Sequence, residues 1–239
     1  MIDRNISNLI FIKWFIGVIF FLIFIFILNH LGFLYPLINN DASYITSLIL
    51  LIFIYFSINV GIELYHLRVR YLNIYNLLSV SKNKSKEEIN LILQQFLNSK
   101  HSDDQSIYTY ITAKENNESS KENFEYSLTS KLNTGWLVAD GLLKLGLIGT
   151  VIGFIIMLSA ITEIDGFDFT MMKDMLQNMS KGMEVALYTT LSGLVSSVLL
   201  SMQYSYLEHY IYKIFYMSNL CLSNFLPNPV NIMNDDEEI

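Results

Sequence analysis

Cysteine and histidine are scarce in this chain, which narrows the chemistry it can perform. The 239 residues include one cysteine, Cys221, so neither a disulfide nor a cysteine metal site can form within the chain. The four histidines are scattered and do not make one ligand set: His30, His66, His101 and His209. The sequence also lacks a phosphate-binding glycine loop, a GxSxG motif and a metalloprotease histidine pair. It therefore predicts neither an enzyme nor a bound cofactor or metal.

Charge is scarce as well. Only 15% of the residues are charged, whereas 52% are hydrophobic, so the apolar residues must be held in runs that water would not tolerate. The net charge of −7 comes from acids spread along the chain and offers no basic surface, so no nucleic-acid partner is expected. The composition predicts an integral membrane protein whose surroundings are the lipid bilayer.

Four apolar runs meet or approach the length of about 20 residues that a membrane helix needs: 14–28, 44–62, 142–161 and about 185–207. They predict an all-α membrane protein with four transmembrane helices. A cleavable signal peptide is the alternative for the first run. No small-x-small cleavage site follows at 29–32, which favours a retained span.

Basic residues predict the orientation. The segment 67–131 holds nine of the fifteen lysines and arginines, and the connection 29–43 holds none. Both termini and the loop 67–131 are therefore expected in the cytoplasm, with an outer connection at about 162–183. The sequence divides into a first helix pair, a cytoplasmic helical loop, a second helix pair and a C-terminal helix with an acidic tail: 1–66, 67–131, 132–212 and 213–239.

Several spans are expected to continue as helices into the cytoplasm. Apolar spacing extends the second span through 66–78 and the fourth through 209–222. A capping box at Ser85 and Glu88 predicts a short helix to about Leu97. The polar stretch 99–122 predicts a mobile link, with helix resuming near Phe124.

Small and hydroxyl residues interrupt two of the runs, LGLIGTVIGF at 145–154 and ALYTTLSGL at 186–194. In each, three residues follow one another at i, i+4 and i+7, on one face of a helix: Gly146, Thr150 and Gly153, then Ala186, Thr190 and Gly193. Such a stripe suits the lining of a narrow polar path. The stripe also suits close packing of membrane helices, and Gly149 is a further small residue for such packing. The pattern alone favours packing over lining.

Ionisable residues are absent from the middle of the runs and stand near their ends: Lys13, Glu63, Lys144, Glu184 and Glu208. Ion transport through hydrocarbon normally needs a charged or titratable group in the membrane. Either the protein moves no ions, or a partner contributes the carboxylate.

Together with the topology, the two segments resemble the MotA/TolQ/ExbB proton-channel family over about residues 133–212. LGLIGTVIGF resembles its Gly-Thr-Val-x-Gly span and EVALYTTLSGLVSS its Ala-Leu-x-x-Thr-x-x-Gly-Leu span. The resemblance implies a homo-pentameric ring in the bacterial inner membrane around a dimer of a single-span ExbD/TolR/MotB-like partner that carries a membrane aspartate. It implies an ion-driven rotary motor that uses H+ or Na+, and it favours the lining interpretation.

By the same resemblance, Thr150 and Thr190 match the lining threonines. Counted from the ends of their spans at 1.5 Å per residue, their depths differ by only about 10 Å. Thr189 points about 100° away and is expected to pack between subunits.

Glu184 stands one residue before the place where exporter-energising members carry a glutamate, and Val185 holds that place. Glu184 is either an outer entrance for the ion or a charge in the first turn of a helix. Four spans resemble the flagellar stator subunit, although no rotor-contacting charges are found. A passive helix-packing scaffold is the alternative function. A secondary transporter is disfavoured because no internal repeat is present.

Overall fold

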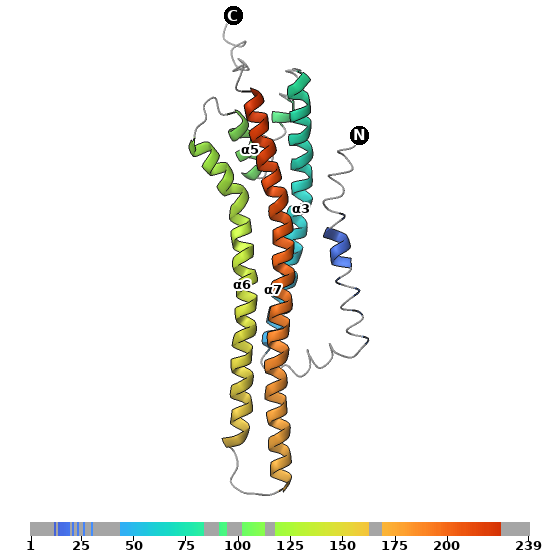
Figure 1. The fold of residues 1–239 in the computed structure, drawn as a ribbon, viewed down its shortest axis with the longest axis vertical. Coiled ribbons are helices and arrows are strands. Elements are labelled where there is room, and N and C mark those ends of the chain that lie inside the picture. The colour runs from blue at the N-terminus through green and yellow to red at the C-terminus, as the bar shows by residue number, and fades with distance from the viewer. Residues whose placement is uncertain are drawn as a thin grey trace, which may run out of the picture. The chain divides into compact units, whose positions relative to one another are not determined.

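The computed structural model describes residues 44–83, 91–94, 102–112, 118–162 and 169–225, with some positions between 12 and 30. The elements within these residues are helices: α3 (Ile45–Asn83), α5 (Ser102–Thr112), α6 (Glu118–Thr162) and α7 (Phe169–Phe225) (Figure 1). Three of them, α3, α6 and α7, are long and apolar enough to cross a membrane. The prediction of an all-helical membrane protein is confirmed at this level.

Of the predicted span 14–28, the structure describes residues 14–19, 21, 23 and 26, and these are helical. Two of its described side chains contact the first half of α3. A Cβ added at Gly61 would lie 2.5 Å from the Trp14 ring, and the rings of Phe21 and Phe53 are 5.8 Å apart in an edge-to-face arrangement. The earlier residue of the first segment, Trp14, contacts the later residue of α3, and Phe21 contacts the earlier one. This segment therefore runs antiparallel to α3.

The long helices extend beyond the apolar runs. α3 continues to Asn83 and α7 to Phe225, which confirms the helical extensions predicted at 66–78 and 209–222. The short helix predicted at 85–97 is described only at 91–94, which are helical.

The prediction of a mobile link at 99–122 is wrong. The stretch 99–122 contains α5 and the start of α6, because Ile107, Tyr110 and Ile111 share one face and are all buried. Most of the expected outer connection, 162–183, is the beginning of α7, which starts at Phe169. The acidic tail lies outside the described residues.

The chain divides into two units, and the long helices each contribute a segment to both. Unit 1 contains the described residues of 63–133 and 206–225, and therefore α5 with parts of α3, α6 and α7. Unit 2 contains those of 12–62 and 134–205, which include the apolar segments. The consecutive domains named from the sequence stay a prediction.

The core of unit 1 is aromatic and joins α5 to the long helices. The ring of Tyr110 stacks on Phe124 of α6 at 4.7 Å between centroids, and Phe124 stacks on Phe215 of α7 at 5.5 Å. The hydroxyl of Tyr110 donates a hydrogen bond to Oδ1 of Asn219. Burial raises the pKa of Tyr110, which keeps the hydroxyl protonated and able to donate.

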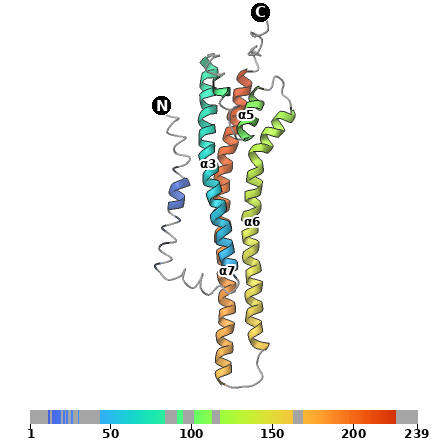
Figure 2. The same ribbon diagram turned by 180° about the vertical axis from the view of Figure 1, so that it is seen from behind.

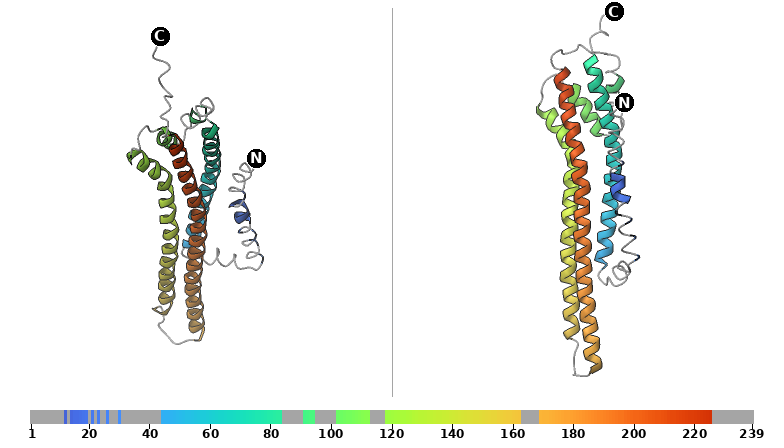
Figure 3. Two further views of the ribbon diagram at one scale, coloured as in Figure 1. Left: turned by 45° about the horizontal axis from the view of Figure 1, so that its top comes forward. Right: turned by 45° about the vertical axis from the view of Figure 1, so that its right-hand side comes forward.

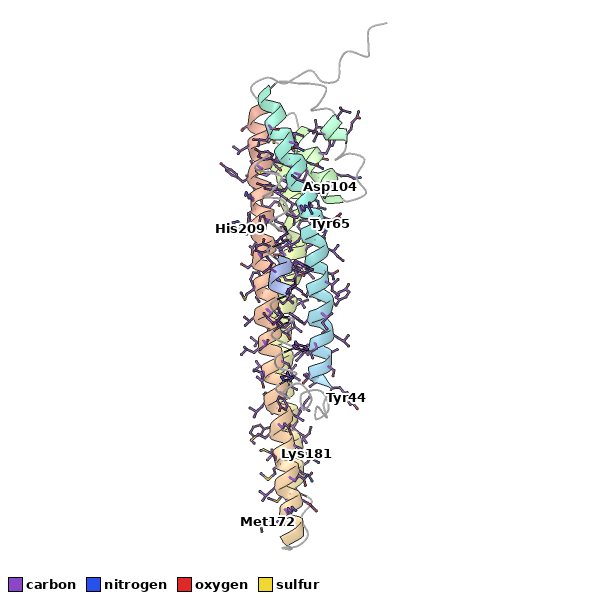
Figure 4. The ribbon with its side chains drawn as sticks, turned by 90° about the vertical axis from the view of Figure 1, so that its right-hand side faces the viewer. Tyr44, Tyr65, Asp104, Met172, Lys181 and His209 are labelled. Atoms are coloured by element: carbon purple, nitrogen blue, oxygen red, sulfur yellow. The ribbon has the colours of Figure 1, made fainter. Side chains whose placement is uncertain are left out.

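Ion pairs add to these contacts in unit 1. Nε of Arg70, on α3, lies 2.6 Å from Oδ1 of Asp104 on α5, and the arginine is only 5% exposed. Figure 4 labels Asp104. Lys131 of α6 pairs with Glu63 of α3 at 2.5 Å in a more exposed position. The short helix α5 is thus held by a buried charge pair, a hydrogen bond and ring stacking.

Candidate ion-pathway site

Glycines bring the backbones of α6 and α7 into contact within unit 2, where the two helices run side by side (Figures 2 and 3). A Cβ added at Gly193 would lie 2.8 Å from the Cα of Gly146. A Cβ at Gly153 would lie 2.6 Å from the backbone nitrogen of Ala186. No larger side chain fits at these points, so the small residues set the distance between the helices.

The line of contact between α6 and α7, termed the seam, includes residues that the sequence stripe omitted. Gly149 faces the side chain of Thr189, which is fully buried. Gly182, one turn before Ala186, lies against the backbone of Gly153 and Met157. Its spacing of four residues from Ala186 is the small-xxx-small signal that would have identified it.

The contacts along the seam fix the register of the two antiparallel helices. Gly146 lies level with Gly193, and Gly153 lies level with Ala186. Residue numbers therefore rise along α6 in the direction in which they fall along α7. Position 150 is then level with 189, one residue from Thr190. The two threonines differ in level by about 1.5 Å, rather than the 10 Å derived from the span ends.

The two threonines also lie at the same edge of the helix pair. At about 100° per residue, Thr150 is turned about 70° from the middle of the seam, and Thr190 is turned about 70° in the same sense. Antiparallel helices are related by a two-fold axis normal to their common plane, so equal rotations point to the same edge. Both threonines are half-buried there, and exposed leucines flank them on α7 at 187 and 194.

The hydroxyl protons of both threonines are used within their own helices. Oγ1 of Thr150 donates to the carbonyl of Leu147 at 2.5 Å, and Oγ1 of Thr190 donates to the carbonyl of Ala186 at 2.5 Å. A hydroxyl that donates its one proton keeps lone pairs for accepting. The edge therefore presents two neighbouring acceptors, which suit a protonated carboxyl group or a cation.

Thr189 has a different environment. Its hydroxyl donates to the carbonyl of Val185 at 2.9 Å, and its side chain is completely buried against Gly149. It packs between two helices of one chain, and the expectation that it packs between subunits is wrong.

Ionisable groups stand on either side of the threonine level. Glu184 is half-buried and lies six residues before Thr190, or about 9 Å along α7. Because α7 begins at Phe169, Glu184 is deep inside the helix, and a first-turn role at the helix dipole is excluded. Lys144 lies six residues before Thr150 and forms an exposed ion pair with Asp140 at 2.6 Å. Among the residues that the structure describes, no group of three His, Cys, Asp or Glu could hold a metal.

Comparison with known proteins identifies a family. A family model described as the MotA/TolQ/ExbB proton channel family matches residues 84–218, more than half of the chain, and this range contains α5, α6 and most of α7. No curated protein and no solved structure matches the chain.

Proposed function

Because this chain belongs to the MotA/TolQ/ExbB proton channel family, we propose that it is a ring subunit of an inner-membrane motor that couples H+ or Na+ flow to mechanical work. The family consists of channels rather than enzymes, and its members typically pair with ExbD/TolR/MotB proteins. The observation that carries the proposal is the position of Thr150 and Thr190 at one level and one edge of the α6–α7 pair.

The proposed assembly is a homo-pentamer around a dimer of a single-span partner whose membrane aspartate lies at the level of the two threonines. Each subunit has four spans with both termini in the cytoplasm. Fifteen per cent charge in 239 residues leaves few groups to bind an ion in the membrane, so the partner supplies the titrating carboxylate.

The hydrogen bonds of the threonines suggest how the ion is sensed. A protonated aspartate has an O–H that can donate to the oxygens of Thr150 and Thr190, whereas an ionised aspartate can only accept. Since the threonine protons are donated to Leu147 and Ala186, the ionised form finds no donor here. The site favours the ion-loaded carboxyl group, and loss of the proton favours departure of the aspartate, which is the basis for movement.

Glu184 is proposed as the outer entrance. It precedes Thr190 on the same helix by about 9 Å, within reach of an ion that approaches the threonine level from outside. The close-packing residues of the seam keep α6 and α7 together while the partner moves: Gly146, Gly149, Gly153, Ala186 and Gly193.

The test is replacement of Thr190 by valine, which preserves the branched shape and removes the acceptor. Ion flux is measured by acidification or by ion-dependent growth arrest in cells that express the complex with the outer domain of the partner deleted. Loss of one such hydrogen bond costs about 1–3 kcal/mol, so flux should fall roughly tenfold to a hundredfold.

The matched control is Thr189→Val, the same change at the adjacent residue, where the hydroxyl is buried in the seam and does not reach the edge. Its flux should stay near wild type at equal membrane levels. If Thr190→Val assembles normally and its ion flux is unchanged, the threonines do not line an ion pathway. That result would favour the passive scaffold.

A further inference from the structure

Tyrosines gather where the apolar runs of α3 and α7 end. Eight of the fifteen tyrosines lie in two short segments, 65–75 on α3 and 204–216 on α7. Tyr65 of α3 and His209 of α7 stand at nearly the same height along the helices (Figure 4). Tyrosine is enriched where a membrane helix passes from hydrocarbon to water, so the two segments mark one surface of the bilayer.

One side of α7 at this level carries hydrogen-bond donors. Tyr206, Tyr210 and Lys213 follow one another at intervals of four and three, within an arc of about 60°. The hydroxyl of Tyr206 donates to the hydroxyl of Tyr210, with 3.3 Å between the two oxygens. A phenol has one proton, and that of Tyr210 is therefore left for a further acceptor.

This side of α7 faces α3. Nζ of Lys213 lies 5.1 Å from the centroid of the Tyr71 ring, and Sγ of Cys221 lies 3.9 Å from the carbonyl oxygen of Ile74. At about 100° per residue, Tyr210 points between the directions of Lys213 and Cys221. The donors of Tyr210 and Lys213 thus lie beside α3, within unit 1.

Lys213 is a half-buried cation that no carboxylate neutralises. The ion pairs of unit 1 involve other cations, and among the residues that the structure describes no acid pairs with Lys213. Glu208, on the same helix, points about 140° away. Contact with the buried ring of Tyr71 attracts the ammonium group but does not neutralise its charge.

Arg68 brings a second positive charge to the same place. It precedes Tyr71 by three residues, so the two residues share a side of α3, and its side chain is half-buried. Lys213 approaches the same ring from α7. The junction of the two helices therefore combines two positive charges with the free proton of Tyr210, which suits an anion.

The level of these donors matches the level of lipid phosphates. The apolar run of α7 ends at about 207, so Tyr210 lies about 4.5 Å and Lys213 about 9 Å further along the helix axis. The polar layer on each side of a bilayer is about 5–7 Å thick. A lysine just outside this layer can extend its amine back into it.

We propose that Tyr210, Lys213 and Arg68 form a binding site for the phosphate of an anionic phospholipid. A phosphate diester can accept from the hydroxyl of Tyr210 and the ammonium of Lys213, which lie one turn apart on one side of α7. A lipid suits the site better than a soluble phosphate, because both helices continue from this level into apolar runs. The inference does not depend on ion transport and takes only the cytoplasmic location of this surface from the proposed function.

The net charge of the site selects among lipids. Phosphatidylglycerol carries one negative charge, whereas phosphatidylcholine has a quaternary ammonium group close to its phosphate. That group would be repelled by Lys213 and Arg68, so an anionic headgroup should bind more tightly.

The first experiment measures lipid binding to the purified full chain in detergent. Phosphatidylglycerol and phosphatidylcholine are titrated separately, and native mass spectrometry counts the molecules bound per chain. Lys213→Gln should lower the affinity for phosphatidylglycerol about tenfold and remove the preference over phosphatidylcholine, because a charge-assisted hydrogen bond is lost. Lys213→Arg keeps the charge and should stay within about threefold of wild type. Lys121→Gln removes the same charge from an exposed position on α6 and should leave the affinity unchanged.

The second experiment removes one hydroxyl at a time. Tyr210→Phe keeps the ring and removes the donor, so it should lower the affinity for phosphatidylglycerol about fivefold. Tyr212→Phe makes the same change at an exposed residue that points about 160° away, and its affinity should stay near wild type. The elution and melting temperature of each variant without added lipid show whether the chain is folded. Should Lys213→Gln fail to fold, the two tyrosine variants decide.

The results separate this inference from the proposed function. Equal affinities for phosphatidylglycerol in Tyr210→Phe and Tyr212→Phe, or in folded Lys213→Gln and Lys121→Gln, would overturn the lipid site. Binding of glycerophosphoglycerol, the headgroup without acyl chains, as tightly as the lipid would assign the site to a soluble phosphate and also overturn the inference. The proposed function is tested independently by the ion flux of Thr190→Val, which does not alter the lipid site.

Discussion

Two glycines of α6 show how strongly the role of one residue type depends on position. A Cβ at Gly153 would meet the backbone of Gly182 and Ala186, whereas a Cβ at Gly141 would meet nothing within 4 Å. Backbone atoms cannot move aside as the end of a flexible side chain can. The same methyl group is therefore expected to have opposite effects at the two positions.

Gly153→Ala should destabilise the protein by about 1–3 kcal/mol, because the seam must open to admit the methyl group. Gly141→Ala should be neutral or stabilising by up to about 1 kcal/mol, since alanine is the better helix former. Thermal denaturation of both variants in one detergent measures the difference. A similar melting temperature for the two would contradict the contact between the helices.

At the residue scale, the sequence identifies the residues of the candidate site but not their arrangement. The small residues and threonines are visible in the printed sequence, yet a spacing of i, i+4 and i+7 does not tell which neighbour of the stripe faces the other helix. Gly149 and Thr189 occupy the seam, and Thr150 and Thr190 stand beside it. Only the contacts between α6 and α7 give the register of the two helices. This register places Thr150 and Thr190 at nearly the same level.

Among the elements, α5 depends most on a few contacts. It has eleven residues, too few for a stable isolated helix, and it is held by Arg70, Phe124, Phe215 and Asn219. The pair of Arg70 and Asp104 is mostly buried, at 5% and 15% exposure. Removal of one partner leaves a buried charge without its counter-ion.

Asp104→Ala should therefore destabilise unit 1 by about 3–5 kcal/mol and loosen α5. Glu63→Ala breaks the more exposed pair with Lys131 in the same unit and should cost no more than about 1 kcal/mol. Hydrogen exchange of the α5 amides measures both effects. Equal protection of α5 in the two variants would show that the buried pair does not hold the helix.

The long helices are predictable because their apolar runs approach the length of a membrane helix and are too long for a β-strand. α5 is not, because its three buried apolar residues are set among polar ones and its helix forms through tertiary contacts. The start of α7 was missed for a related reason. Its charges favour a loop, and the alignment of Met172, Leu176, Met179 and Met183 on one side becomes visible only when the whole segment is placed on one helix.

For the whole molecule, the orientation in the membrane can be tested with two cysteines. Ser102→Cys lies at the start of α5, in the segment rich in basic residues, and should be shielded from an impermeant thiol reagent in intact cells. Gln177→Cys lies at an exposed position of α7, on the side that is proposed to be outside, and should react. The native Cys221 is fully buried and gives little background. Labelling at position 102 and protection at 177 would reverse the proposed topology.

Five hydroxyl groups in the apolar segments of α6 and α7 donate to carbonyls about one turn earlier on their own helices: those of Thr150, Ser159, Thr189, Thr190 and Ser192. This has a consequence for biogenesis. A helix whose donors are satisfied internally can leave the translocation machinery and enter lipid alone, without the penalty of an unmet polar group. We therefore expect the chain to insert into the bilayer before it meets the proposed partner, whichever of the two proteins is synthesised first.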